Sequence, residues 1–284
     1  MYLKISIIGV GKVGDTLARL WHNAGYQIVT VYNRTPSKAE NLAKQTGATI
    51  AATPKDAVTA ADLICLTVSD DAIQPITAAL SHADWQDKAL IHTSGAASTD
   101  ILDPVAKKGA MVGSLHPALP FADVHTAMQK VAGASFAIEA SAAPLQQWLE
   151  HLVAAVSGNH IIIPPGKKAL YHAALVITSN YTVTLYAVAQ SLLASLSDDT
   201  TAIDNILQPL LTATCANIRQ QGIPEALTGP LTRADVGTLQ SHLNAIDDAT
   251  LKQAYSALAR LSFPMLHQRG IHTQQIEELL QEHT

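Results

Sequence analysis

Two side chains that can hold or move a proton, Lys168 and His172, lie four residues apart in a stretch of low charge. From Ala169 to Ser197 the sequence contains no Asp, Glu, Lys or Arg. Residues i and i+4 share a face of a helix, so both side chains can point into one cleft. Apolar surroundings and a second cation nearby disfavour the charged form of each group, which helps it to donate a proton near neutral pH. The spacing predicts a pair that protonates or polarises a reacting oxygen or nitrogen. The alternative is a histidine that satisfies a buried polar neighbour and a lysine that reaches solvent.

A glycine-rich turn near the N-terminus has the spacing of a phosphate cradle. Gly9, Gly11 and Gly14 follow an apolar run over residues 2–8 and open an amphipathic pattern over 12–24. Between a strand and a helix, G-x-G-x-x-G is the fingerprint of dinucleotide binding, because the pyrophosphate then lies on free N–H groups at the helix N-terminus. The alternative is a glycine turn without a ligand. The context predicts cofactor contacts from Gly9, Val10, Gly11, Lys12, Val13 and Gly14.

The end of the second predicted strand, over 27–32, distinguishes NAD from NADP. NAD sites usually carry Asp or Glu there, whereas a 2′-phosphate needs a cation and small donors. The sequence after this strand reads Asn33-Arg34-Thr35-Pro36-Ser37-Lys38, and the first carboxylate is Glu40. A polar strand–helix turn without a ligand is the alternative. Because the guanidinium of Arg34 can pair with phosphate, we predict NADP(H) held by Asn33, Arg34, Thr35 and Ser37.

Three polar segments follow later predicted strands, where ligands bind outside the carboxyl ends of a parallel sheet. They are Val68–Asp71, His92–Ala96 and Gly113–Pro117. His116 is a candidate proton donor or substrate ligand, because imidazole titrates near neutral pH, and a structural histidine is the alternative. The segments also predict cofactor contacts from Val68, Ser69, Ser94 and Gly95.

Short apolar runs alternate with helical patterns through the first half of the chain, which predicts parallel strand pairing with right-handed crossovers. We expect an α/β Rossmann domain over residues 1–165, with a doubly wound, mostly parallel sheet. The expected strands are 2–8, 27–32, 48–51, 62–68, 88–93, 110–115, 134–139 and 160–163.

Pro164-Pro165-Gly166 ends this alternation, and the rest of the chain has helical periodicity. We expect an all-α domain over residues 166–284. Its predicted helices are 167–196, 200–221, 231–243, 248–268 and 273–282.

The expected helix over 167–196 is unusual because it lacks charge yet contains many hydroxyl and amide side chains. Buried polar groups are costly in lipid, so the segment does not predict a membrane span. A helix buried in protein fits better, and we expect a homodimer formed through the C-terminal helical domain. A solvated face is the alternative for the polar stripe that it carries, namely Lys168, His172, Ser179, Thr182, Tyr186 and Gln190.

The overall composition excludes several classes of function. A net charge of −5 argues against a nucleic-acid partner. The first predicted strand begins without the pattern of a signal peptide, and neither Cys65 nor Cys215 belongs to a CxxC motif. We therefore expect a cytoplasmic protein with two reduced cysteines that serve packing. No HExxH motif or Cys/His cluster appears, so we expect no metal.

Taken together, the motifs resemble a two-domain family in which a Rossmann-like domain precedes the domain of unknown function 2520. At Ala234 the chain departs from the family, which usually has glycine before the aspartate. The resemblance rests on Gly9–Gly14, His92–Gly95, Gly113–Pro117, Lys168–His172, Ser179–Tyr181, and Leu227–Pro230 with Arg233 and Asp235.

More distantly, the architecture is similar to pyrroline-5-carboxylate reductase and to the 3-hydroxyacid dehydrogenases. The latter use a helix-borne lysine with an amide side chain four residues later. This resemblance implies a catalytic role for Lys168, with His172 in place of the amide.

These observations lead to one favoured function and one rival. We expect an NADPH-dependent oxidoreductase that passes a hydride between the nicotinamide and a small carbonyl or imine metabolite. The rival is a protein that binds NADP(H) as a sensor or regulator without turnover.

For Arg233, a structural ion pair with Asp235 is the alternative to a ligand role. Substrate contacts are expected from His116, Ser179, Asn180 and Arg233.

Overall fold

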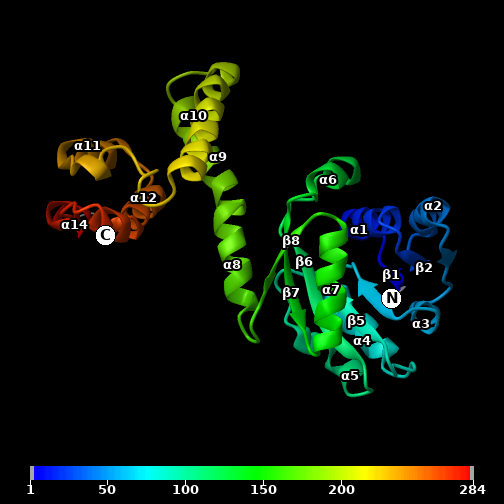
Figure 1. The fold of residues 1–284 in the computed structure, drawn as a ribbon. Helices are drawn as coiled ribbons and strands as arrows, with labels where there is room; N and C mark the ends of the chain where they lie inside the picture. The colour runs from blue at the N-terminus through cyan, green and yellow to red at the C-terminus, as the bar shows by residue number, and fades with distance from the viewer. Residues whose placement is uncertain (1–2, 282–284) are drawn as a thin grey trace. The chain divides into compact units, whose positions relative to one another are not determined.

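A computed structural model describes residues 3–281 of the chain (Figure 1). Contacts divide the chain into two compact units, Met1–Thr182 and Val183–Thr284. The first unit holds the sheet and also the first helix that follows Pro164-Pro165-Gly166. The expected boundary between domains at residue 165 stays a prediction.

The first unit is built on one sheet of eight strands in the order β3-β2-β1-β4-β5-β6-β7-β8. The order reverses direction between β1 and β4, which is the switch point where ligands of such sheets bind. All eight expected strands are present, as β1 (Lys4–Ile8), β2 (Gln27–Tyr32), β3 (Thr49–Ile50), β4 (Leu63–Leu66), β5 (Ala89–His92), β6 (Met111–Pro117), β7 (Ser135–Ala140) and β8 (Asn159–Ile162).

Helices cover both faces of this sheet, so the expected doubly wound Rossmann fold is confirmed. On one face, Leu17, Leu42 and Leu149 pack into one buried cluster, and the Trp21 indole N–H donates to the Leu152 carbonyl oxygen at 3.2 Å. The helices of this face are α1 (Lys12–Asn23), α2 (Pro36–Thr46) and α7 (Ala143–Ala155), with α6 (Val124–Lys130) beside α1. The other face carries α3 (Pro54–Thr59), α4 (Asp70–Leu80), η1 (Thr99–Leu102) and α5 (Asp103–Ala106).

Strand β7 departs from the parallel pairing that alternation predicts, because it runs antiparallel to β6. The segment between them carries only the short helix α6, which packs on α1 and does not cross the sheet. The β6–β7 register places Ser114 opposite Glu139 and Pro117 opposite Phe136. Strand β6 thus continues through His116 and Pro117, which were expected in a loop after the strand.

The rest of the described chain is helical, as expected, but the long helix over 167–196 is interrupted. It consists of α8 (Lys168–Thr178) and α9 (Asn180–Ala194), and Ser179 lies between the two helices as the C-cap of α8, with φ −101° and ψ −64°. The hydroxyls of Thr178 and Thr182 donate to backbone carbonyls four residues earlier, a pattern that bends helices. None of the helices in the described residues is long and apolar enough to cross a bilayer.

The second unit contains a small core of its own. Leu239 and Leu243 pack with Ala259, Ile276 and Leu280. Cys215 is exposed, whereas Cys65 lies in the core of the sheet, so only the latter serves packing as expected. The remaining elements are α10 (Thr200–Gln221), η2 (Leu231–Arg233), α11 (Val236–Ala245), α12 (Ala249–Leu261), α13 (Phe263–Gln268) and α14 (Gln274–Gln281).

The turn between η2 and α11 contains a strained residue. Ala234 has φ 50° and ψ 37°, in the left-handed region that glycine adopts freely. Asp235 caps α11, because its carboxylate accepts hydrogen bonds from the Thr238 backbone N–H at 3.0 Å and the Thr238 hydroxyl at 2.7 Å. No salt bridge joins Arg233 to Asp235 in the described residues.

Replacing Ala234 with glycine should relieve this strain. We expect Ala234→Gly to raise the free energy of unfolding by about 1 kcal/mol, as measured by urea denaturation. The matched control is Ala257→Gly, at an exposed position inside α12, which should lower it by about 0.5–1 kcal/mol. A loss of stability in both variants would show that Ala234 is not strained.

Candidate functional site

The turn between β1 and α1 is shaped by two glycines that the fold requires. Gly9 has φ +102°, and a Cβ there would collide with Val68 and the Thr67 carbonyl. A Cβ on Gly14 would collide with the Gly9 carbonyl oxygen and the Thr67 hydroxyl. The Asn33 side chain fixes the turn from β2, because its Oδ1 accepts from the Val10 N–H at 2.8 Å. The expected turn is therefore present, with α1 packed closely on the sheet.

At Gly11, unlike Gly9 and Gly14, the fold itself does not require glycine. It is the exposed N-cap of α1 with φ −90° and ψ −171°, a conformation open to any residue. A Cβ at Gly11 would come no closer than 3.9 Å to the Thr67 carbonyl oxygen. Because nothing in the described protein crowds this position, the missing side chain fits the close approach of a pyrophosphate to the helix N-terminus.

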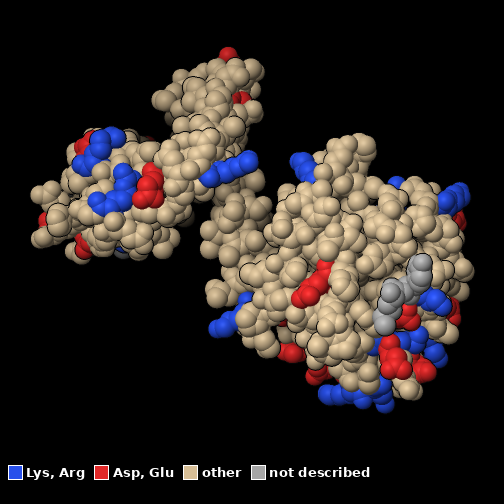
Figure 2. All heavy atoms as spheres, in the orientation of Figure 1, with Lys and Arg blue, Asp and Glu red and all other residues tan. Residues whose placement is uncertain are grey.

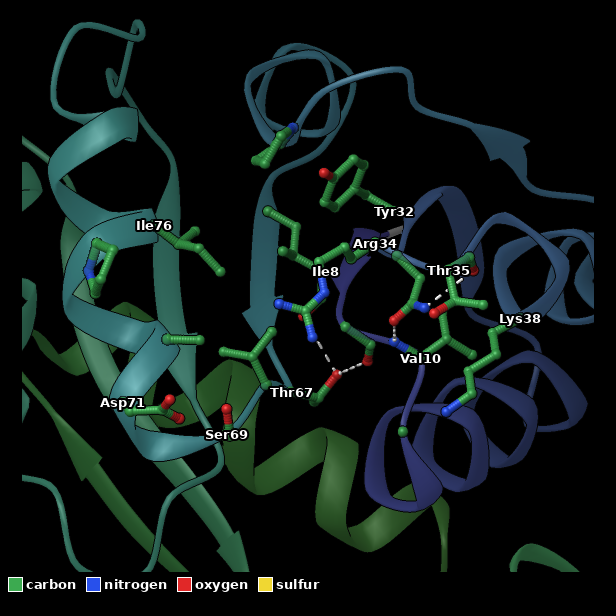
Figure 3. Close-up of a pocket in the computed structure, with 17 residues that line it drawn as sticks. Ile8, Val10, Tyr32, Arg34, Thr35, Lys38, Thr67, Ser69, Asp71 and Ile76 are labelled. Atoms are coloured by element: carbon green, nitrogen blue, oxygen red, sulfur yellow. Dashed lines mark hydrogen bonds between the residues drawn. The ribbon is translucent and has the colours of Figure 1, made fainter.

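A cavity of about 590 Å³ opens above this turn, at the carboxyl ends of β1, β2 and β4. Figure 3 shows Thr35 and Lys38 on one side, across from Ser69, Asp71 and Ile76. Arg34 also lines the cavity, and neither Arg34 nor Lys38 forms a salt bridge with a described residue. These two free cations fit a 2′-phosphate. Ser37 does not line the cavity, so its expected cofactor contact stays a prediction.

A second cavity of about 380 Å³ continues from the glycine turn toward β5. It shares Gly11, Thr67 and Val68 with the first cavity and reaches Ser94 and Gly95. Expected cofactor residues Lys12 and Val13 also line it. The two cavities together form a track along the carboxyl edge of the sheet, which has the direction that an extended dinucleotide needs.

The Ser94 hydroxyl shapes the loop after β5. Its Oγ accepts from the backbone N–H groups of Ala96 at 3.2 Å and Ala97 at 2.9 Å. The Ser94 N–H in turn donates to Nδ1 of His92 at 3.2 Å. Ser94 therefore holds Gly95 in place, and a direct contact between Ser94 and a cofactor stays a prediction.

Lys168 lies in a buried cluster that joins α8 to the sheet. Its Nζ donates to Ser114 Oγ at 2.5 Å and lies 3.0 Å from Glu139 Oε2. The Ser114 hydroxyl donates to the same carboxylate oxygen at 2.7 Å. Lys168 is 2% exposed and Glu139 is 7% exposed, so the amino group does not reach solvent. Burial lowers the pKa of Lys168, and the neighbouring Glu139 carboxylate opposes that shift.

His116 and His172 meet at Gly95. Their ring centroids lie 6.4 Å apart, and the two rings are nearly perpendicular. A Cβ on Gly95 would lie 2.7 Å from His116 Nε2 and 2.8 Å from His172 Cδ2, so only glycine fits between the rings. Tyr171 completes the group, because its hydroxyl lies 2.9 Å from His116 Nδ1. The sheet and α8 thus bring two expected site residues together at the end of the track.

The surroundings keep His116 and Tyr171 neutral at neutral pH. Burial, together with the Lys168 and His172 side chains, lowers the pKa of His116 to about 4. Burial raises the pKa of Tyr171 to about 12. At neutral pH a neutral imidazole therefore meets a neutral phenol, and one of them must donate the hydrogen bond between them.

The remaining expected residues lie elsewhere. Ser179 and Asn180 are exposed at the junction of α8 and α9, and Arg233 is exposed in η2 of the second unit. The described residues contain no group of three or more His, Cys, Asp or Glu side chains placed to hold a metal.

Two residues of the site were not identified from the sequence. Glu139 lies within an apolar strand pattern, where a lone carboxylate is a signal that a cation must be near. Tyr171 precedes His172 but carries no spacing signature of its own. Only the fold places Glu139 against Lys168 and Tyr171 against His116.

Family comparisons cover both parts of the chain. Residues 4–95 match the family described as "NADP oxidoreductase coenzyme F420-dependent". Residues 134–262 match the domain of unknown function 2520. A curated relative, the "Uncharacterized oxidoreductase YfjR" of Bacillus subtilis, is 44% identical over 69 residues, which are 24% of this chain and 23% of that protein. The chain thus spans under a quarter of that relative's length.

Solved structures share the fold over nearly the whole chain. Protein TM1727 from Thermotoga maritima has a TM-score of 0.76 at 22% identity, over 93% of this chain and 99% of that one. An imine reductase from Pseudomonas sp. has a TM-score of 0.63 at 19% identity, over 93% of this chain and 94% of that one. A 1-pyrroline-5-carboxylate reductase from Streptococcus pyogenes has a TM-score of 0.61 at 15% identity, over 92% and 98% of the two chains.

The comparisons confirm the expected resemblance and the expected cofactor. The solved structures support the fold, and the match over residues 4–95 identifies the cofactor as NADP(H). Residues 4–95 are thus similar to NADP oxidoreductases, and residues 134–262 are similar to the domain of unknown function 2520.

Proposed function

We propose that this protein is an NADPH-dependent oxidoreductase that acts on a small carbonyl or imine compound. One observation carries the proposal: the track that begins at Arg34 and the glycine turn ends at Gly95, between His116 and His172. A protein that only senses NADPH has no need of two ionisable rings at that end. Fold alone does not establish a reaction, but two ionisable rings at the end of the track are suited to proton transfer.

Different residues of the chain would contact different parts of the cofactor. Arg34 and Lys38 would pair with the 2′-phosphate, and the α1 N-terminus at Gly11 would receive the pyrophosphate. The loop at Ser94 and Gly95 would border the nicotinamide end. NADPH supplies the hydride, and the protein supplies position and electrostatics.

His116 has the geometry to orient a reacting oxygen or nitrogen. With the Tyr171 hydroxyl as donor to Nδ1, the neutral imidazole carries its proton on Nε2, the atom that faces Gly95. That N–H can hydrogen-bond to a carbonyl or imine and polarise it. His172 lies on the other side of Gly95 and is the second candidate for proton transfer.

Lys168 is best interpreted as a positioning residue. Its amino group is buried against Glu139 and Ser114, so it cannot contact a substrate in this arrangement. Its charge lowers the pKa of His116 and thereby favours the neutral ring. The pair also fixes the start of α8, from which Tyr171 and His172 project.

Turnover distinguishes the enzyme from the sensor. The protein should oxidise NADPH with at least one member of a panel of ketones, imines and 3-oxoacids. Tight NADPH binding without turnover on any of them would favour the sensor.

The cofactor contacts predict a strong preference for NADPH over NADH. Because a charge-assisted Arg–phosphate pair contributes about 1.5–3 kcal/mol, Arg34→Ala should weaken NADPH binding roughly tenfold or more and leave NADH binding nearly unchanged. Isothermal titration calorimetry measures the affinities for NADPH and NADH. Lys44→Ala is the matched control, since it removes an exposed cation of α2 that does not line the cavity. Equal affinity of the wild type for the two cofactors would contradict the assignment.

The buried Lys168–Glu139 pair predicts how stability changes when one or both of its members are replaced. Lys168→Met leaves the Glu139 carboxylate buried without its cation, which should cost about 3–5 kcal/mol of stability. A second change, Glu139→Gln, should recover much of that loss. In the double variant the pKa of His116 should rise from about 4, because the nearby positive charge is gone.

Thermal denaturation measures the loss of stability, and an NMR titration of the His116 ring measures the change in its pKa. A His116 pKa that stays unchanged in the double variant would restrict Lys168 to a structural role. If Lys168→Met and His172→Ala each retain turnover within about threefold, neither is catalytic and the proton transfer falls to His116.

We also propose that two copies of the chain associate through α9 and α10. Both helices expose large apolar side chains, and Figure 2 shows few charged groups on the visible face of these helices. Many exposed large apolar side chains on two helices are typical of helices that pack against another protein surface. The α9–α10 apolar face consists of Val183, Leu185, Leu192, Leu196, Ile206, Leu210, Leu211 and Ile218.

Sedimentation tests the association directly. The wild type should have about twice the chain mass of 30.1 kDa at micromolar concentration. Leu210→Arg should yield monomers, because a charge buried in an apolar interface lacks a partner. Leu261→Arg, at a position of α12 that is 73% exposed and outside the face, should leave the dimer intact. A monomeric wild type would refute the proposal.

A further inference from the structure

An apolar hollow of about 310 Å³ lies along one face of α8, inside the first unit. Positions 169, 172, 173, 176 and 177 share this face, because they are spaced three and four residues apart. Two of them are alanines, and a third alanine from the loop after β5 faces them. The small side chains create the hollow, which is lined by Ala96, Ala169, His172, Ala173, Val176, Ile177 and Tyr181.

The hollow adjoins the end of the cofactor track. Ala96, which lines it, directly follows Gly95, the residue held between the His116 and His172 rings. His172 itself belongs to both places, since it lines the hollow and meets His116. A molecule with its reacting atom at the two histidines would therefore extend its adjacent group into the hollow.

The lining contains no Asp, Glu, Lys or Arg. The nearest cation along the helix, Lys168, is 2% exposed and already paired with Glu139 at 3.0 Å. The hollow is open to solvent on one side, because Ile177 and Tyr181 are 61% and 55% exposed. A carboxylate there would give up part of its water and gain no Lys or Arg in exchange. An alkyl or aryl group would instead bury its surface against alanine, valine and isoleucine.

We propose that this hollow is the subsite for an uncharged alkyl or aryl group next to the reacting carbonyl or imine. The substrate class is therefore an apolar ketone or imine, and compounds with a carboxylate at that end bind less tightly. The inference rests on the proposed function for the position of the reacting atom, but binding to the hollow does not depend on turnover.

Two ketones of equal chain length test the subsite. 2-Heptanone ends in a methyl group, and 6-oxoheptanoate carries a carboxylate at the same distance from its carbonyl. Titrations followed by saturation-transfer NMR, with the full chain and NADP⁺, measure binding in the absence of reduction. We expect 2-heptanone to bind about tenfold more tightly, because the carboxylate gains no cation in the hollow and gives up part of its water.

A pair of alanine variants tests the location. Ala173→Leu fills the hollow and should weaken 2-heptanone binding at least about tenfold. Ala174→Leu adds the same side chain at the next position of α8, which is exposed and outside the hollow, and should leave binding unchanged. Melting temperature and sedimentation show whether either variant alters the fold or the assembly.

The outcomes separate the subsite from the reaction. Binding of 2-heptanone that depends on Ala173, without NADPH oxidation, would support the subsite and count against the proposed function. Preferred turnover of 6-oxoheptanoate would overturn the subsite and leave the proposed function standing. Absence of 2-heptanone binding, or equal loss in both variants, would also overturn the subsite.

Discussion

The buried contact between Lys168 and Glu139 is the constraint on which the candidate site depends. A lysine ammonium and a carboxylate removed from water are unfavourable unless each compensates the other and their remaining hydrogen-bonding capacity is used. Here the Ser114 hydroxyl bridges the two, with donation to Glu139 and acceptance from Lys168. The cluster connects β6, β7 and the first residue of α8, so the helix that carries Tyr171 and His172 starts at a fixed point of the sheet.

The same cluster affects the electrostatics around His116. Burial, together with the positive charge of Lys168, lowers the pKa of His116 and leaves its ring neutral. A neutral ring can donate from one nitrogen and accept at the other, which a protonated ring cannot. The Tyr171 hydroxyl at Nδ1 then supports the proton on Nε2, the nitrogen nearest Gly95. The buried Lys168 charge thus influences the protonation of His116, a residue of the candidate site.

The glycines of the turn between β1 and α1 have two different roles: Gly9 and Gly14 are required by the fold, whereas Gly11 leaves space for a ligand. Gly9 and Gly14 have no room for a Cβ, so helix α1 can pack on the sheet only with glycine there. Gly11 has room, and its lack of a side chain serves the approach of a pyrophosphate. Gly95 is a third case, because its missing side chain lets two rings from different elements meet.

The sequence by itself determined the local features of this protein. Apolar alternation located all eight strands, and the glycine spacing with Arg34 predicted both the cradle and the choice of NADP(H), because these depend on residues close in the chain. Sequence periodicity could not reveal the interruption at Ser179, because side-chain hydroxyls bonding to the backbone leave the apolar pattern unchanged.

Tertiary structure alone decided the partners of Lys168 and His116. Alternation of strands and helices predicts parallel pairing, yet β7 runs antiparallel to β6, and that register sets Glu139 opposite Ser114. Lys168 lies 29 residues after Glu139 in the chain, and its amino group contacts both Glu139 and Ser114. Tyr171 and His116 lie 55 residues apart in sequence and meet only because α8 packs against the end of β6. Such contacts follow from how elements pair and pack, which no local spacing encodes.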